Sequence, residues 1–202
     1  MRTRKAGKRH TLLIYRRTMD RLWVVTLALG LLLALVWGWM WFSDTPILNA
    51  RYEIWMLVGS IIAILVAGFA LFGRYAAYVQ PHKDHLRVVT PFLRLKISYR
   101  RIRGVHPASF QQLFPPREAS WAQESFLEPL YGKTAVVVDL TAYPMSPKML
   151  KIFLAPQMFS PQSKGLVFLV PDWMDFSTEL DTFRSTWKPA PSNRSSTQRR
   201  TR

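Results

Sequence analysis

The chain has no cysteine and few acidic residues: its 202 positions hold 12 Asp and Glu against 28 Lys and Arg. The absence of cysteine excludes disulfides, thiolate metal sites, iron–sulfur clusters and a cysteine nucleophile. It also favours a domain that faces a reducing compartment. The shortage of acid leaves a net charge of +16 at pH 7, which raises the question of a nucleic-acid partner.

The positive charge is concentrated at the two ends of the chain. Residues 1–21 hold eight Lys and Arg against Asp20 alone, and residues 188–202 hold five basic residues and no acid. This distribution argues against a globally basic domain, so we expect no nucleic-acid partner. The first segment reads as a basic cytoplasmic tail. The last is rich in Pro, Ser and Arg, and we expect it to be a disordered basic tail.

Two long segments contain no charged residue. Residues 22–42 run for 21 positions and residues 54–72 for 19 positions without Asp, Glu, Lys or Arg. About 20 apolar residues in a helix cross the hydrocarbon core of a bilayer, so both segments are predicted to be transmembrane helices. The first is too long for the apolar region of a secretory signal. Neither holds an ionisable side chain, and we therefore expect no ion or substrate pathway within them.

Flanking charges predict how these two segments are oriented. The connection 43–53 holds one basic residue, Arg51, whereas basic residues precede the first segment and follow the second. The positive-inside rule then places both termini in the cytoplasm and the connection outside. The sequence predicts a multi-pass protein of the cell membrane, a hairpin in the lipid bilayer carrying a cytoplasmic domain. Small residues on the second helix could pack it against the first or against a partner, or could simply face lipid: Gly59, Ser60, Ala63, Ala67 and Gly68.

Residues 74–187 have the pattern of a small α+β domain. Short segments rich in β-branched and aromatic residues, separated by turn sequences, predict strands at 74–80, 85–92, 92–99, 134–140, 148–155 and 165–170. Between them lies a long polar and aromatic insertion, 106–133, with a short helix expected over 119–128. Apolar residues at steps of three and four predict an amphipathic helix over 171–187, capped by Asp172. A strongly bent antiparallel sheet closed by this helix fits the order of elements.

The stretch "RLKISYRRIRGVHP" (94–107) is the strongest candidate contact surface. Within 92–99 the basic residues share one strand face and apolar residues the other, and further basic residues follow the strand. Three interpretations stay open: a solvated face, a contact with anionic lipid headgroups, or a surface for an unknown protein partner. The candidate contact residues are Arg94, Lys96, Arg100, Arg101 and Arg103.

The order of two N-terminal spans, "YVQ…DHLRVVTPFLRLKISYRRIRGVHP", later strands and a closing helix resembles the bacterial pleckstrin-homology (PH)-like membrane proteins. In that family the second of two paired strands ends in a basic segment of the type I-x-x-I-x-x-V. The matching residues here are Ile97 or Tyr99, Ile102 and Val105. The resemblance covers about residues 75–187 and the hairpin topology. It implies a seven-stranded bent sheet or barrel capped by a C-terminal helix, with a non-enzymatic role. The insertion 106–133 departs from the family's pattern.

Catalytic patterns are not evident in the sequence. There is no phosphate-binding glycine run and no Gly-x-Ser-x-Gly elbow. His82, Asp84 and His85 are close in sequence, but a turn beside a membrane favours solvated side chains over metal ligands. We expect no enzyme activity, no metal and no cofactor. The expected function is an interaction or scaffolding protein at the membrane; the alternative is an accessory subunit of a membrane transporter or enzyme complex.

Overall fold

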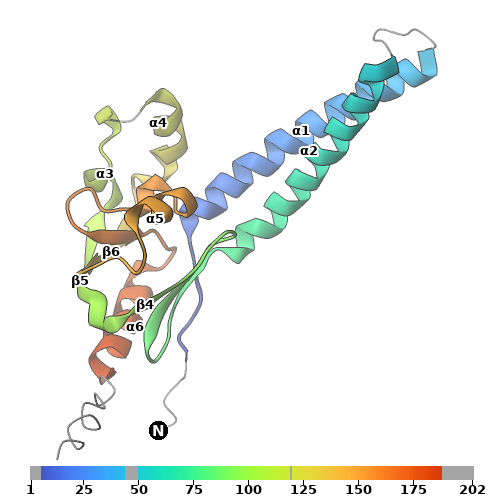
Figure 1. Cartoon of the computed structure of the whole chain (residues 1–202). Coiled ribbons are helices and arrows are strands. Elements are labelled where there is room, and N and C mark those ends of the chain that lie inside the picture. Colours follow the sequence, from blue (N-terminus) through green and yellow to red (C-terminus); the bar gives the residue numbers. More distant parts are fainter. Residues whose placement is uncertain (1–5, 44–49, 119, 188–202) are drawn as a thin grey trace, which may run out of the picture.

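The computed structural model of the chain describes residues 6–43, 50–118 and 120–187. Its fold is α+β, as predicted: two long apolar helices project from a domain with two small antiparallel sheets and a C-terminal helix (Figure 1). The predicted disordered tail, 188–202, lies outside the described residues, as does most of the predicted external connection.

The two long helices are α1 (Leu13–Ser43) and α2 (Ala50–Ala76). Both are long and apolar enough to cross a membrane, by length and composition. Only 6% of the apolar stretch of α1 and 17% of that of α2 are buried, so the described remainder of the chain leaves their apolar surface uncovered.

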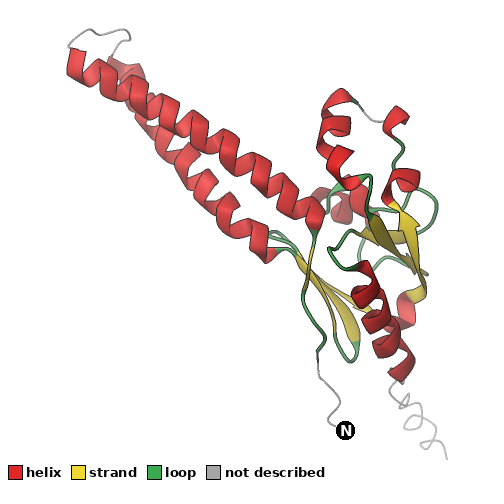
Figure 2. Ribbon diagram, turned by 180° about the vertical axis from the view of Figure 1, so that it is seen from behind, coloured by secondary structure: helices red, strands yellow, loops and turns green. Residues whose placement is uncertain are grey.

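Small residues let α1 and α2 lie side by side, as both views of the ribbon show (Figures 1 and 2). The Ser60 hydroxyl donates to the Gly30 carbonyl at 2.9 Å, and a Cβ on Gly30 would lie only 2.9 Å from the Cγ1 of Ile64. Ala63 is buried in the same helix pair, whereas a Cβ on Gly68 would meet no described atom within 4 Å. Of the predicted small residues, most therefore serve the contact between the two helices.

The first turns of α1 belong to the domain. Leu12, Ile14 and Tyr15 are buried in the main hydrophobic core. The Tyr15 hydroxyl donates to the Phe153 carbonyl (3.1 Å) and accepts from the Ala155 amide (3.2 Å). Residues 6–21 of the predicted basic tail therefore form a strand and a helix start packed on the domain, because the apolar run 12–15 lies between the two groups of basic residues.

The first sheet has four antiparallel strands in the order β1 (His10–Thr11), β2 (Tyr78–Pro81), β3 (His85–Val89) and β4 (Arg94–Ser98). The predicted alternation over β4 is confirmed, since Leu95 and Ile97 are buried and Arg94 and Lys96 are exposed. β1 directly precedes α1, and β2 directly follows α2. The helix pair is thus inserted between two neighbouring strands, and both helices leave the sheet at the same end.

The second sheet has three antiparallel strands in the order β5 (Ile102–Ser109), β6 (Thr134–Leu140) and β7 (Gly165–Phe168). The predicted strand 134–140 is confirmed in full. A 3-10 turn, η1 (Tyr99–Arg101), separates β4 from β5. The described strands therefore form two separate sheets and no closed barrel.

Helices complete the domain. The predicted cap of α6 (Trp173–Thr186) is confirmed, because the Asp172 carboxylate accepts from the Asp175 amide at 3.0 Å. The prediction of a strand over 148–155 is wrong: Ser146 at the N-cap and Pro147 in the first turn start a helix there. The remaining short helices are α3 (Phe110–Leu113), η2 (Pro116–Glu118), α4 (Trp121–Leu127), η3 (Glu128–Leu130), α5 (Pro147–Phe153) and η4 (Pro156–Met158).

Residues 6–11, which we call the N-terminal strap, join the first sheet to α6. The Gly7 amide donates to the Pro81 carbonyl at 2.8 Å, and the Lys8 amide donates to the Glu179 carboxylate at 3.0 Å. The buried His10 ring lies 3.2 Å from the same carboxylate and packs against Phe176 at 5.2 Å between ring centroids. The strap is therefore a structural element of the domain.

Gly7→Ala is expected to destabilise the domain by about 1–3 kcal/mol, since a Cβ at Gly7 would lie 2.6 Å from the Glu179 carboxylate and displace it from the strap. Thermal unfolding of the reconstituted chain measures this. Gly132→Ala is the matched control, because a Cβ there meets no described atom within 4 Å. Equal stability of the two variants would contradict the close approach of Glu179 to the strap.

Candidate functional site

The outward face of the four-stranded sheet is basic. On β3 and β4 this face carries Arg87, Arg94 and Lys96, and the outward positions of the fully described strands β2–β4 include no Asp or Glu. Arg9 of the strap adds a fourth cation, with its guanidinium 4.9 Å from the ring centroid of outward-facing Tyr78. We call Arg9, Arg87, Arg94 and Lys96 the basic face.

Like charges stand directly opposite each other on this face. Arg87 on β3 pairs in register with Lys96 on β4, and Val89 pairs with Arg94. Directly opposed residues of an antiparallel pair have Cβ atoms about 4.5–5.5 Å apart, and like charges at this separation destabilise the sheet. An anion placed over the face would relieve this repulsion, so the arrangement is suited to binding negative charge.

Two histidines lie at the end of the basic face remote from the helices. The rings of His82 and His85 are stacked, with centroids 5.0 Å apart and planes within 2°. Burial lowers the pKa of His82 below its ordinary value, and the cations of Arg87 and Lys96 lower it further. Burial also lowers the pKa of His85, followed by the charges of His82 and Lys96, while Asp84 acts in the opposite direction. The field of the basic face therefore reaches both rings.

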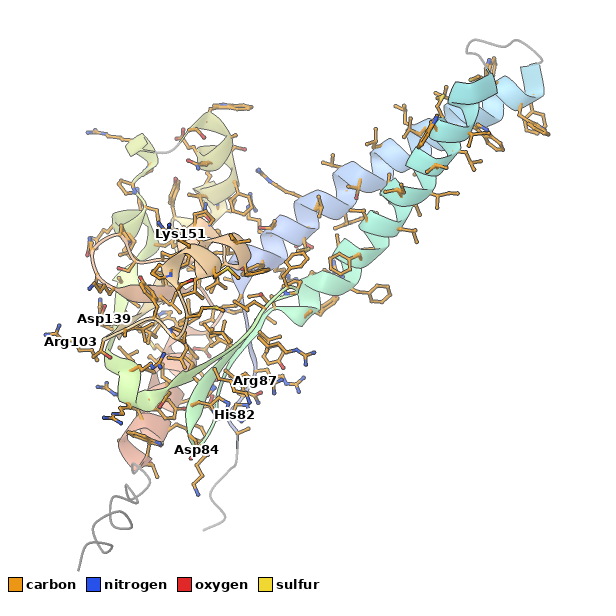
Figure 3. The ribbon with its side chains drawn as sticks, viewed as in Figure 1. His82, Asp84, Arg87, Arg103, Asp139 and Lys151 are labelled. Carbon is orange, nitrogen blue, oxygen red and sulfur yellow. The ribbon has the colours of Figure 1, made fainter. Side chains whose placement is uncertain are left out.

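Lys96→Gln is expected to raise the pKa of both histidines, because it removes a cation that disfavours their protonation. It should also stabilise the chain in zwitterionic lipid by roughly 0.2–1 kcal/mol at low salt, since Arg87 loses a like charge opposite it. NMR titration of histidine-labelled protein and thermal unfolding measure the two effects. The control is Lys151→Gln, on α5 away from the histidines (Figure 3). Unchanged histidine pKa values would contradict an electrostatic effect of the basic face on His82 and His85.

The structure brings together only two of the five predicted contact residues. Arg94 and Lys96 lie on the basic face. Arg101 lies in η1, where its guanidinium donates to the Tyr143 carbonyl at 3.3 Å. Arg103 lies on β5, and Figure 3 shows it near Asp139 on the opposite side of the domain from Arg87. The fifth, Arg100, is exposed beside Arg101 in η1.

Two cations of the basic face were not among the predicted contact residues. The position of Arg87 on this face is predictable from the sequence, because Arg87 alternates with buried Leu86 and Val88 in the segment "HLRVV". The position of Arg9 is not predictable in this way, since it depends on the pairing of β1 with β2, which are separated in sequence by both long helices. No local pattern in the sequence carries that pairing.

The basic face begins beside the end of α2. In the turn between β3 and β4, the Leu93 amide donates to the Thr90 hydroxyl at 3.0 Å. The neighbouring Phe92 ring packs against Phe69 of α2, with centroids 6.1 Å apart. Phe69 lies within the predicted charge-free span 54–72, and Arg94 follows Phe92 by two residues. The first cation of the face is thus close to the level at which that span ends.

A second polar cluster lies on the other sheet. The Ser163 hydroxyl donates to one oxygen of the Asp139 carboxylate (2.5 Å), and His106 Nδ1 lies 3.3 Å from the other. The carboxylate stands between the hydroxyl and the imidazole. Activation of a serine nucleophile requires the imidazole in the middle position, so this order of groups does not form that relay.

The described part of the chain offers no metal-binding cluster beside the basic face. Among the described residues, no three His, Cys, Asp or Glu side chains come together in a way that could hold a metal ion. The chain matches no family model, no curated protein and no solved structure. The basic face is therefore interpreted from its own geometry and charge.

Proposed function

We propose that the chain is a non-enzymatic, membrane-anchored interaction protein. In this proposal α1 and α2 cross the cell membrane as a hairpin, both termini and the domain lie on the cytoplasmic side, and the basic face contacts anionic lipid headgroups. The observation that carries the proposal is the acid-free basic face, with its opposed like charges, beginning beside the end of an apolar helix.

The exposed apolar surface of the two long helices supports the anchor. Large side chains such as Leu35, Trp41 and Leu65 are about 70% exposed, a state that costs free energy in water and is favourable in lipid. Near the C-terminal end of α1, remote from the domain, the rings of Trp37 and Trp41 stack with centroids 5.9 Å apart. Aromatic residues at the end of an apolar helix are typical of a membrane interface.

The order of the elements supports a PH-like domain. Four strands, then three strands, then α6 follow one another once the helix pair between β1 and β2 and the short helices between β4 and β7 are set aside. That number and order agree with the seven strands and closing helix that the resemblance to PH-like membrane proteins implies. The domain then begins with the strap, before the first span.

Distance from the membrane favours lipid as the partner of the basic face. A strand rises about 3.3 Å per residue, so Arg94 lies about 7 Å and Lys96 about 13 Å along the chain from Phe92. Each Lys or Arg near an anionic leaflet contributes about 1 kcal/mol, an effect that fades over about 8–10 Å in physiological salt. Arg94 should therefore contribute most, and Arg87 and Lys96 less.

The absence of cysteine makes a direct test straightforward, since one introduced cysteine carries one label. A donor dye at Ser98→Cys, on the outward side of β4, reports energy transfer to acceptor lipids when the full chain is reconstituted in vesicles. We expect greater transfer in vesicles with phosphatidylglycerol than in pure phosphatidylcholine, and we expect added salt to remove the difference.

The matched variants separate the basic face from net charge. Arg87→Gln, Arg94→Gln and Lys96→Gln together should abolish the dependence on anionic lipid. Arg100→Gln, Arg101→Gln and Arg103→Gln remove the same charge away from that face and should preserve it. If transfer is equal in the two lipids, or if the two triple variants behave alike, the basic face is not a lipid contact.

A further inference from the structure

Few large apolar side chains are exposed on the domain. Outside the two long helices, the described residues that are large, apolar and exposed are Phe92, Trp121, Met149, Ile152 and Met174. Single exposed apolar residues are ordinary on a protein surface. Two of these five, however, belong to segments that contact the long helices: Phe92 itself contacts α2, and Trp121 begins α4, whose other end contacts α1.

Phe92 is held beside α2. Its ring is 63% exposed and yet lies 6.1 Å, between centroids, from Phe69. The turn that carries it is closed by two hydrogen bonds: the Thr90 amide donates to the Leu93 carbonyl (2.8 Å), and the Leu93 amide donates to the Thr90 hydroxyl (3.0 Å). The closed turn fixes the direction of Phe92. The Phe92 ring is therefore held at the level of Phe69, which lies within the charge-free span 54–72.

Trp121 begins α4, whose C-terminal end is held to α1. Arg17 Nε donates to the Phe126 carbonyl at 2.7 Å, and Arg21 Nη2 donates to the Ser125 carbonyl at 2.8 Å. Both guanidinium groups also lie over the Phe126 ring, 5.8 and 5.4 Å from its centroid. Cations at the C-terminal carbonyls of a helix are favourable, so this clamp fixes α4 to α1.

The clamp is located at the membrane boundary of α1. Arg21 is the residue immediately before the charge-free run 22–42, and Figures 1 and 2 show α4 beside the start of α1. Trp121 begins α4 and is 85% exposed. Tryptophan is favoured in the headgroup region of a bilayer, which is about 5–8 Å thick on each side of the hydrocarbon.

We infer that Phe92 and Trp121 are two bilayer-interface anchors, one beside α2 and one beside α1, that hold the domain against the leaflet. This inference rests on the proposed function, because it requires α1 and α2 to cross the membrane. Two anchors on either side of the helix pair restrict rotation of the domain about the helices. The anchor at Phe92 also brings Arg94 to the headgroups. The anchor at Trp121 gives a role to the insertion 106–133, because this insertion contains Trp121.

The other exposed apolar residues are placed farther from the boundary. α5, which carries Ile152, is held through Tyr15, seven residues and about 10 Å of helix before Leu22. Met174 lies on α6, whose contacts are with the two sheets and the strap. Met174 is 60% exposed and therefore provides a control of similar exposure that should remain in water.

Electron paramagnetic resonance of single nitroxide labels tests this inference. Four full-length variants, Phe92→Cys, Trp121→Cys, Met174→Cys and Leu35→Cys, are labelled and reconstituted in phosphatidylcholine–phosphatidylglycerol vesicles. Power saturation then compares collisions with oxygen, which partitions into lipid, and with a water-soluble nickel chelate. All four sites are exposed, so the labels replace no core side chain.

We expect the labels at 92 and 121 to be shielded from nickel at least five-fold relative to the label at 174, with oxygen collisions approaching those at 35. If 35 is shielded but 92 and 121 are as open to nickel as 174, the anchors are refuted while the membrane hairpin stands. If only one is shielded, the two-anchor arrangement is wrong. If the label at 35 is itself open to nickel, the proposed function and this inference fail together.

Discussion

Phe176→Ala is expected to destabilise the domain by about 3–5 kcal/mol, the usual cost of truncating a fully buried phenylalanine. Phe176 is completely buried on α6, and its ring lies 6.0 Å from Phe168 of β7 and 5.2 Å from His10 of β1, between centroids. It therefore joins the C-terminal helix to both sheets. The loss should appear as a lower midpoint in thermal or denaturant unfolding of the reconstituted chain.

Met174→Ala is the matched control for this prediction. Met174 is two residues away on the same helix but 60% exposed, and truncating an exposed side chain usually changes stability by less than about 0.5 kcal/mol. A similar effect of the two substitutions would mean that α6 does not close the core in the way described.

Removal of residues 2–11 is the second change with a large expected effect. The N-terminal strap makes two hydrogen bonds to the Glu179 carboxylate, from the Lys8 amide and from His10. Hydrogen bonds to charged groups contribute roughly 1.5–3 kcal/mol each, and less where they are exposed, as the Lys8 bond is, so about 2–4 kcal/mol should be lost. The edge of β2 also loses its partner strand. Hydrogen exchange should increase across β2 and α6, which are far apart in sequence.

Lys8→Gln separates the strap itself from its exposed charge. The Lys8 ammonium lies 2.9 Å from the Asp175 carboxylate, and this ion pair lies on the surface. Exposed pairs contribute little to stability, so this variant should keep normal protection in β2 and α6. If deletion of residues 2–11 leaves hydrogen exchange in α6 unchanged, the strap is not part of the domain.

Local patterns in the sequence predicted the elements whose structure depends on neighbouring residues. Strand 134–140 and the helix closed by Asp172 follow from short apolar runs and from spacing, and both are confirmed. Residues 148–155 form no strand because Ser146 and Pro147 start a helix there, and this start outweighs the β-type composition of the segment. The sequence does contain this helix start, and because Ser146 and Pro147 come first in the segment, the residues after them form a helix.

Long-range pairing limited the prediction of the candidate site. The alternation within β4 is sufficient to place Arg94 and Lys96 on one face, but closeness in sequence does not place the basic residues that follow β4 on the same face. The 3-10 turn η1 carries the chain to the other sheet, so Arg103 leaves that face. Arg9 joins it only because β1 pairs with β2 across the helix pair. Neither event has a local signature.

A membrane hairpin that carries a domain on one side is tested most directly by the accessibility of two single cysteines to a membrane-impermeant maleimide. One replaces Ile47 in the connection between the helices, and the other replaces Gln162, which is exposed on the domain. In sealed right-side-out membranes we expect labelling at position 47 alone, with position 162 labelled only after the membranes are disrupted. Labelling of both positions in sealed membranes, or of 162 alone, would contradict this topology.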